Sequence, residues 1–106
     1  MKVIFLDRDG VINQEVGYLH EIKYFKFIDG IFEACKYFQS LGYKLIVVTN
    51  QSGIARGYYQ EEDFHTITKW MLVQFNNNDV DILDVFFAHT VQSQLVCAVS
   101  LNRVCF

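Results

Sequence analysis

Short apolar runs that stop abruptly at polar residues are the main pattern along this chain of 106 residues. They predict three strands, over Lys2–Leu6, Tyr43–Val48 and Ile82–Phe87. Most positions in these runs are apolar, and many are β-branched or aromatic, which is typical of strands in a buried parallel sheet. The polar residues that follow the runs are therefore expected at the carboxyl edge of that sheet.

Apolar residues between the strands recur at helical spacing. They predict one helix that begins at Asp29 or Gly30, ends near Ser40 and is stopped by Gly42, and a second over residues 60–76. The alternation of strand and helix predicts an α/β fold with a Rossmann-like parallel sheet of three strands and flanking helices.

Two carboxylates follow the first apolar run. Asp9 lies two residues after Asp7, so an extended strand end directs both side chains to the same side. Like charges this close disfavour each other's ionisation, and a divalent cation or a shared proton relieves them. The pair is a candidate hard-cation site with one carboxylate as nucleophile and the other as acid or base. A solvated turn is the alternative for an isolated Asp-x-Asp.

A second polar cluster follows the run that ends at Val48. Thr49 and Asn50 offer a hydroxyl and an amide, and Gly53 and Arg56 add a flexible turn and a guanidinium. These groups suit the binding of phosphate oxygens. The alternative is a helix start capped by Ser52 or Asn50.

In this order, and separated by a predicted helix, the two clusters resemble motifs I and II of the haloacid dehalogenase (HAD) superfamily of phosphatases. Within it, the chain is most similar to the D,D-heptose 1,7-bisphosphate phosphatase group, which includes histidinol-phosphate phosphatase domains. The resemblance covers residues 1–87 and rests on the segments Leu6–Asn13, Gly17–Tyr18, Phe27–Gly30 and Val48–Gly57.

The resemblance implies roles for individual residues. Asp7 matches the nucleophile that takes the phosphoryl group as an aspartyl-phosphate, and Asp9 matches the acid/base. Mg²⁺ is expected on the Asp7 carboxylate and the Asp9 backbone carbonyl. Thr49 and Asn50 match the phosphate-binding motif II. The other substrate-binding residues implied by the resemblance are Glu15, Val16, Gly17, Tyr18, Gln51, Ser52 and Arg56.

The expected function is therefore Mg²⁺-dependent hydrolysis of a sugar bisphosphate, namely the 7-phosphate of D-glycero-D-manno-heptose 1,7-bisphosphate, a precursor for lipopolysaccharide. Histidinol phosphate is the alternative substrate. The long excursion from Asn13 to Phe27 is predicted to place its aromatic residues as a flap over the site. These aromatic residues are Tyr18, Tyr24, Phe25 and Phe27.

The expected chemistry needs more positive charge than the two motifs provide. A carboxylate that approaches a phosphate dianion to ~3.5 Å meets a repulsion of roughly 9 kcal/mol at an effective dielectric constant of about 20. In the family, a motif III lysine and a metal held by motif IV carboxylates offset it. Here the last lysine is Lys69 and the last acidic residue is Asp84. The competing interpretation, which we favour for this chain taken alone, is a non-catalytic remnant with a weak metal and phosphate site.

The composition changes sharply near Ala88. Arg103 is the only charged residue from Val85 to Phe106, and the family's Cys-Pro-His zinc loop and Cys-x-Cys-Arg-Lys-Pro segment are absent there. If one T is restored after the Phe86 and Phe87 codons, permitted codons for residues 88–106 can be read in the neighbouring frame as CPHSPEPACVCRKPKPGMF. The sequence thus predicts residues 1–87 as the amino-terminal part of a HAD-type domain and 88–106 as an out-of-frame tail on a truncated chain.

Composition bounds the remaining properties. A net charge of −3 offers no basic patch, so neither nucleic acid nor membrane is expected as a partner. With no signal segment and no apolar run near ~20 residues, a cytoplasmic location is expected. Three cysteines favour reduced thiols. His89, Cys97 and Cys105 match no zinc spacing, so no zinc is expected despite its presence in the family. Sequence does not fix the oligomeric state.

Overall fold

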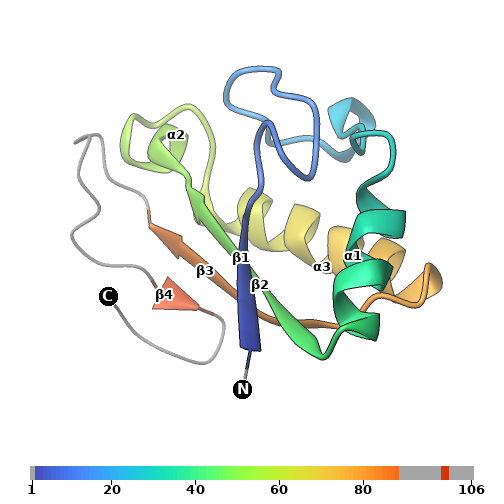
Figure 1. The fold of residues 1–106 in the computed structure, drawn as a ribbon. Coiled ribbons are helices and arrows are strands. Elements are labelled where there is room, and N and C mark those ends of the chain that lie inside the picture. Colours follow the sequence, from blue (N-terminus) through green and yellow to red (C-terminus); the bar gives the residue numbers. More distant parts are fainter. Residues whose placement is uncertain (1, 89–98, 101–106) are drawn as a thin grey trace.

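The fold is a parallel sheet flanked by helices, and the computed structural model describes residues 2–88 and 99–100 of it. Three parallel strands lie in the order β1 (Lys2–Asp7), β2 (Tyr43–Asn50) and β3 (Ile82–Ala88), as Figure 1 shows. The two-residue strand β4 (Val99–Ser100) pairs antiparallel with β3. The predicted α/β fold and its three strands are confirmed, and each strand extends one or two residues past its predicted carboxyl end.

The two long helices follow the predicted bounds closely. α1 (Ile31–Ser40) begins after Gly30, and Gly42 follows it with a φ of 89°, which a residue with a Cβ adopts only at a cost. α3 (Glu61–Asn77) begins with a capping box, in which the Asp63 carboxylate accepts the Gln60 backbone N–H at 2.8 Å. Two shorter helices, η1 (Ile22–Tyr24) and α2 (Ser52–Ala55), are too brief to produce a periodic pattern.

Both long helices cover the same face of the sheet. The ring of Phe64 in α3 lies 4.4 Å from that of Phe87 in β3, and Phe32 in α1 lies 5.3 Å from Phe75 in α3. Along β1, β2 and β3 the buried positions on this face form one core with the helices. The strand residues of this core are Leu6, Leu45, Val47, Val85 and Phe87.

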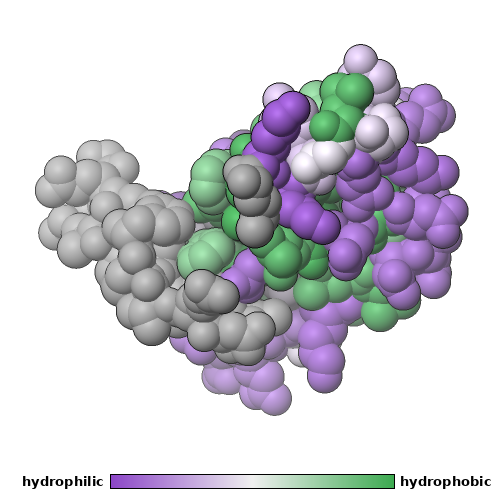
Figure 2. All heavy atoms as spheres, turned by 60° about the horizontal axis from the view of Figure 1, so that its bottom comes forward, coloured by the Kyte–Doolittle hydropathy of each residue, from purple (hydrophilic) through white to green (hydrophobic). Residues whose placement is uncertain are grey.

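The opposite face of the sheet is less buried than the helix-covered face in the part of the chain that the structure describes. Phe5 is 62 % exposed there, and Val3, Ile46 and Val48 are only partly buried. Figure 2, which brings the underside of Figure 1 forward, shows hydrophobic residues at the surface beside hydrophilic ones. Among the described strands, β1 pairs with β2 alone, so its other edge is unpaired. The first aspartates of the chain therefore lie at the end of an edge strand.

The excursion between β1 and α1 differs from its prediction. Phe25 is buried against Trp70, with ring centroids 5.3 Å apart, and Phe27 packs against Phe75 at 5.7 Å. Tyr24 is exposed on the short helix η1. The expectation of an aromatic flap is wrong for these residues, because the apolar rings bury more surface in the core. Only Tyr18 reaches the candidate site.

Three further predictions concern the cysteines, the tail at residues 88–106 and membrane-spanning segments. Cys35 is a buried free thiol, and burial raises its pKa to about 11. His89, Cys97 and Cys105 lie outside the described residues, as does nearly all of the predicted tail. Across residues 2–88 and 99–100, no helix combines the length and apolarity that crossing a bilayer requires.

Candidate active site

A tight turn after β1 positions the two aspartates. Asp7 is the last residue of the strand, and the carbonyl of Arg8 then accepts the backbone N–H groups of Ile12 at 2.8 Å and Asn13 at 3.1 Å. Gly10 occupies the turn with a φ of 92°. The chain thus reverses direction within a few residues and brings Asn13 back beside Asp9.

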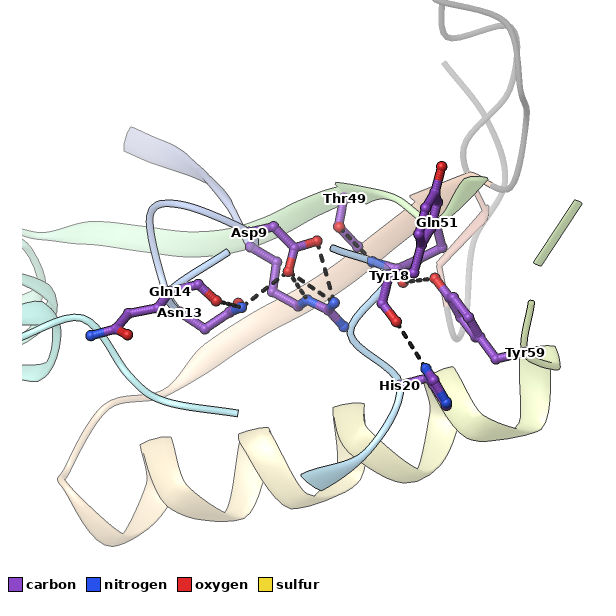
Figure 3. A network of polar contacts seen from close by, with 9 residues as sticks. Asp9, Asn13, Gln14, Tyr18, His20, Thr49, Gln51 and Tyr59 are labelled. Atoms are coloured by element: carbon purple, nitrogen blue, oxygen red, sulfur yellow. Dashed lines mark hydrogen bonds and ion pairs between the residues drawn. The ribbon is translucent and has the colours of Figure 1, made fainter. Parts of the chain in front are cut away.

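Asp9 is held by two buried side chains. Its Oδ1 accepts bonds from Arg8 Nη2 at 3.0 Å, Arg8 Nε at 3.3 Å and Asn13 Nδ2 at 3.0 Å, and Figure 3 shows this cluster. The Arg8 side chain is 1 % exposed and the Asp9 side chain 28 %. From the described residues Oδ2 accepts one bond, from Arg8 Nη2 at 3.3 Å. The charge-assisted bonds therefore fix Oδ1 and leave Oδ2 as the freer oxygen.

Asp7 is the more exposed of the two carboxylates. Desolvation by partial burial raises its pKa, the backbone N–H of Arg8 opposes this by donating to the carboxylate, and the charge of Asp9 adds to the rise. The positive charge of Arg8 lowers the pKa of Asp7 but is the smallest of these effects. The contribution of Asp9 to the rise means that the two aspartates lie close enough to interact, as the sequence predicts. Asp7 therefore has too little positive charge around it to offset its own desolvation and the charge of Asp9.

At the end of β2, three buried polar side chains form a ladder. The Tyr59 hydroxyl donates to Gln51 Oε1 at 2.5 Å, and Gln51 Nε2 donates to Thr49 Oγ1 at 2.9 Å. All three residues are buried, and Figure 3 shows them in line beside Asp9. Because β1 pairs with β2 so that Asp7 lies opposite Val48, Thr49 is only one residue beyond the level of Asp7.

A cavity of about 320 Å³ joins the two strand ends. It brings together Asp9, the loop after it and the segment after β2, as the sequence predicts for most of the candidate residues. The predicted residues that line it are Asp9, Glu15, Gly17, Tyr18, Asn50, Gln51 and Ser52. The predicted residues that do not line it are Asp7, Val16, Thr49 and Arg56.

The four residues outside the cavity lining differ in their surroundings. Val16 and Arg56 are exposed, Arg56 at the end of α2. Thr49 is buried beneath the segment that lines the cavity, and Asp7 lies at the strand end beside it. Their assignment as site residues therefore remains a prediction, with geometric support for Asp7 and Thr49 from their place in the sheet.

Gly53 allows the loops to approach each other closely. A Cβ at this position would lie 2.9 Å from Tyr18 Cδ1 and 2.9 Å from Tyr59 Cζ. Tyr18 itself has a φ of 50°, and its ring meets that of Tyr58 edge-on at 4.7 Å. The glycine is thus needed for packing rather than for a turn, and it lets Tyr59 reach Gln51.

Sequence reasoning missed three residues of this site. Arg8 and Asn13 hold Asp9, and Tyr59 holds Gln51. The place of Arg8 between Asp7 and Asp9 in the sequence could have indicated its role. A guanidinium that is buried there needs an ion-pair partner, and the two aspartates are its neighbours in the chain. No pattern distinguishes Tyr59 from Tyr58, although one is buried and the other exposed.

The carboxylate oxygens at the end of β1 are of the chemical type that binds a hard cation. A divalent ion would relieve the desolvated, like-charged Asp7 carboxylate, and carboxylate oxygens are the ligands that Mg²⁺ prefers. Among the described residues, no three or more His, Cys, Asp or Glu side chains gather to hold a metal ion. The described residues thus offer part of a coordination shell.

Comparison with known proteins decides the family. The chain is 50% identical to a D-glycero-beta-D-manno-heptose-1,7-bisphosphate 7-phosphatase of Haemophilus influenzae over 86 residues, which are 81% of this chain and 47% of that protein. It is 51% identical to a D-glycero-alpha-D-manno-heptose-1,7-bisphosphate 7-phosphatase of Campylobacter jejuni over 85 residues, which are 80% of this chain and 49% of that protein. The chain belongs to the D,D-heptose 1,7-bisphosphate phosphatase family, which is HAD-like.

A solved structure of this phosphatase family shares the fold. The D,D-heptose 1,7-bisphosphate phosphatase of B. bronchiseptica, crystallised with magnesium and phosphate, matches with a TM-score of 0.80 and 26% identity. The match covers 91% of this chain and 55% of that one. No family model matches the chain. This member of the heptose-bisphosphate phosphatase family spans about half the length of the curated relatives it matches.

Proposed function

We propose that this chain carries the site of a Mg²⁺-dependent phosphomonoesterase that acts on a small sugar bisphosphate, at the 7-phosphate of a D-glycero-D-manno-heptose 1,7-bisphosphate. The cavity is the observation that supports it, since it unites Asp9 with Asn50 and Gln51 at the carboxyl edge of the sheet. This edge is where α/β folds bind phosphate esters. Glu15, Gly17 and Tyr18 supply a further part of the wall and suit sugar hydroxyls.

In the proposed reaction the aspartates divide the chemistry. A carboxylate oxygen of Asp7 forms a bond to phosphorus while the bond from phosphorus to the sugar oxygen breaks, and Asp9 gives its proton to that oxygen. Water then attacks the aspartyl-phosphate, Asp9 takes a proton from it, and inorganic phosphate leaves. Oδ2 of Asp9 suits the proton transfer, because Oδ1 already accepts three bonds.

Phosphate is held mainly by neutral groups. The hydroxyl of Thr49 and the amide of Asn50 end β2 and are proposed to donate to phosphate oxygens. Mg²⁺, on Asp7 and the Asp9 carbonyl, would offset the repulsion between carboxylate and phosphate. We propose that residues 1–87 are the amino-terminal part of this HAD-type domain and that the zinc site of the family is absent from this chain.

Phosphate release from a heptose bisphosphate tests the proposal. The purified chain with Mg²⁺ is compared with Asp7→Asn, which keeps the shape of the side chain and removes the nucleophile. A release rate that depends on Asp7 and on Mg²⁺ supports the proposal. Equal rates for the two proteins contradict it. Histidinol phosphate, as a parallel substrate, distinguishes the two branches of the family.

A second candidate function is that of a non-catalytic remnant which binds metal and phosphate weakly. The observation that favours it is the absence, within the described part of the chain, of a third metal-ligating side chain beside the aspartates. A remnant binds inorganic phosphate in the presence of Mg²⁺ but releases none from a substrate. Titration calorimetry with phosphate, next to the release assay, separates the two candidates.

A further inference from the structure

The ladder from Tyr59 to Thr49 has a direction. Tyr59 donates its proton to Gln51 Oε1, and Gln51 in turn donates from Nε2 to Thr49 Oγ1. Each bond uses one donor and one acceptor, so the orientation of the Gln51 amide sets the role of Thr49. With the amide turned over, Oε1 would accept the Thr49 proton, and the amide would donate to the phenol instead.

Chemistry favours the first orientation. A phenol is a better donor and a poorer acceptor than an aliphatic hydroxyl, so the amide oxygen faces Tyr59 and its nitrogen faces Thr49. Burial raises the pKa of Tyr59 to about 12, so the phenol keeps the proton it donates at any physiological pH. The ring is itself fixed, since it packs against Gly53 and stacks on His20 with centroids 5.2 Å apart.

The consequence falls on Thr49. Its hydroxyl oxygen already accepts from Gln51, so its proton is left to donate. Among the described residues no acceptor takes that proton, although the side chain is 97 % buried, given its 3 % exposure. A buried hydroxyl whose donor is unused is costly unless something accepts it. An oxygen of a bound phosphate at the end of β2 is such an acceptor.

We propose that Tyr59 and Gln51 are positioning residues that orient the Thr49 hydroxyl as a permanent donor to phosphate. The inference rests on the proposed function for the identity of the ligand, but the orientation itself is a property of the free protein. In this role Gln51 uses Oε1 and one Nε2 proton within the chain, and it acts on phosphate through the Thr49 hydroxyl. Tyr59 acts on Thr49 indirectly, by orienting the Gln51 amide.

Nuclear magnetic resonance of the free chain tests the orientation. The Gln51 Nε2 protons are expected to show nuclear Overhauser effects to the Thr49 methyl group and not to the Tyr59 ring. Tyr59→Phe removes the hydroxyl that favours one orientation of the Gln51 amide. Overhauser effects from the Nε2 protons to both the Thr49 methyl group and the ring at position 59 are then expected. Overhauser effects from the amide to the Tyr59 ring in the unmodified chain would overturn the inference.

Titration with inorganic phosphate in Mg²⁺ tests the consequence. Tyr59→Phe is expected to weaken phosphate binding about five-fold, the equivalent of one net hydrogen bond. Thr49→Val removes the donor itself, so adding Tyr59→Phe to it is expected to cause no further loss. Tyr58→Phe, at the exposed neighbouring tyrosine, is the matched control and is expected to leave the affinity unchanged.

Gln51→Glu reverses the ladder. A carboxylate accepts from both neighbours, takes the Thr49 proton and so removes the donor. The new negative charge also repels phosphate. Gln51→Glu in the Thr49→Val background measures this repulsion alone, because the Thr49 donor is already missing there. A loss larger in the native background than in Thr49→Val supports the inference, and equal losses contradict it.

The outcomes separate the two proposals. If phosphate binds but Tyr59→Phe and the native chain bind it equally, the positioning role is wrong while the proposed function stands. If the amide has the expected orientation but phosphate does not bind in Mg²⁺, the proposed function is wrong and the ladder is a structural feature. Additive losses in the double variant also contradict the inference, because they would mean that Tyr59 acts without Thr49.

Discussion

Truncating either aspartate of the pair removes a proposed catalytic group, but only one truncation is expected to destabilise the fold. Asp9→Ala removes the ion-pair partner that the buried guanidinium of Arg8 has among the described residues, where one of its nitrogens, Nη1, already has no partner. Removing one member of a buried ion pair costs about 3–5 kcal/mol. Because water reaches Asp9 from one side, the lower end of about 3 kcal/mol applies, which is roughly 10–20 °C in Tm for a domain of this size.

Asp7→Ala is the matched control. Asp7 is exposed, and its raised pKa means that the folded state disfavours its charge, so its loss is expected to change stability by under about 0.5 kcal/mol. Asp9→Asn is the graded variant. It keeps an acceptor for Arg8 and Asn13 but no charge, so an intermediate loss is expected.

The assay is urea unfolding followed by circular dichroism at neutral pH, with the three variants and the unmodified chain at one concentration. The expected order of stability is the unmodified chain and Asp7→Ala together, then Asp9→Asn, then Asp9→Ala. The reasoning is refuted if Asp9→Ala and Asp7→Ala unfold at the same urea concentration. It is refuted as well if Asp9→Ala is destabilised by less than about 1 kcal/mol.

Further predictions concern packing, pH and the coding DNA. Gly53→Ala is expected to cost about 1–3 kcal/mol and to weaken phosphate binding, because its Cβ collides with the Tyr18 and Tyr59 rings; urea unfolding and phosphate titration measure both. Stability is expected to fall as pH rises from 9 to 11 through Cys35, whose pKa is raised from 9.0 to about 11, since the unfolded thiol ionises first. Cys35→Ala should flatten that part of the pH profile of Tm, and a profile identical to that of the unmodified chain would contradict the assignment. We also propose that the chain beyond about residue 87 is read out of frame; coding DNA whose codons cannot yield the restored string would exclude it.

The strands and long helices could be predicted because each is a local signal. An apolar run that ends at Asp7 or Thr49 defines a strand end, and Gly42 and the capping box at Asp63 define helix limits within the chain itself. Each strand is joined to the next by a crossover that contains a helix, and strands connected in this way commonly lie side by side, as β1, β2 and β3 do. This is why most of the cavity lining was accessible from the sequence.

What the sequence did not reveal depends on tertiary contacts, some of them between residues far apart in the chain. Whether Phe25 covers the site or enters the core is decided by Trp70, forty-five residues later. Whether Tyr59 or its neighbour turns inward is decided by the space that Gly53 leaves. Such choices are made by tertiary packing, and no local pattern records them.

The buried guanidinium beside Asp9 has an evolutionary consequence. A descendant that had lost its reaction would still unfold more readily on losing this aspartate, so purifying selection would preserve the Asp-x-Asp signature after turnover had ceased. In this lineage the presence of Asp9 is therefore weak evidence that a protein still catalyses the reaction. Asp7 is exposed, and its replacement is expected to leave the fold intact, so it is the position at which decay would first become visible.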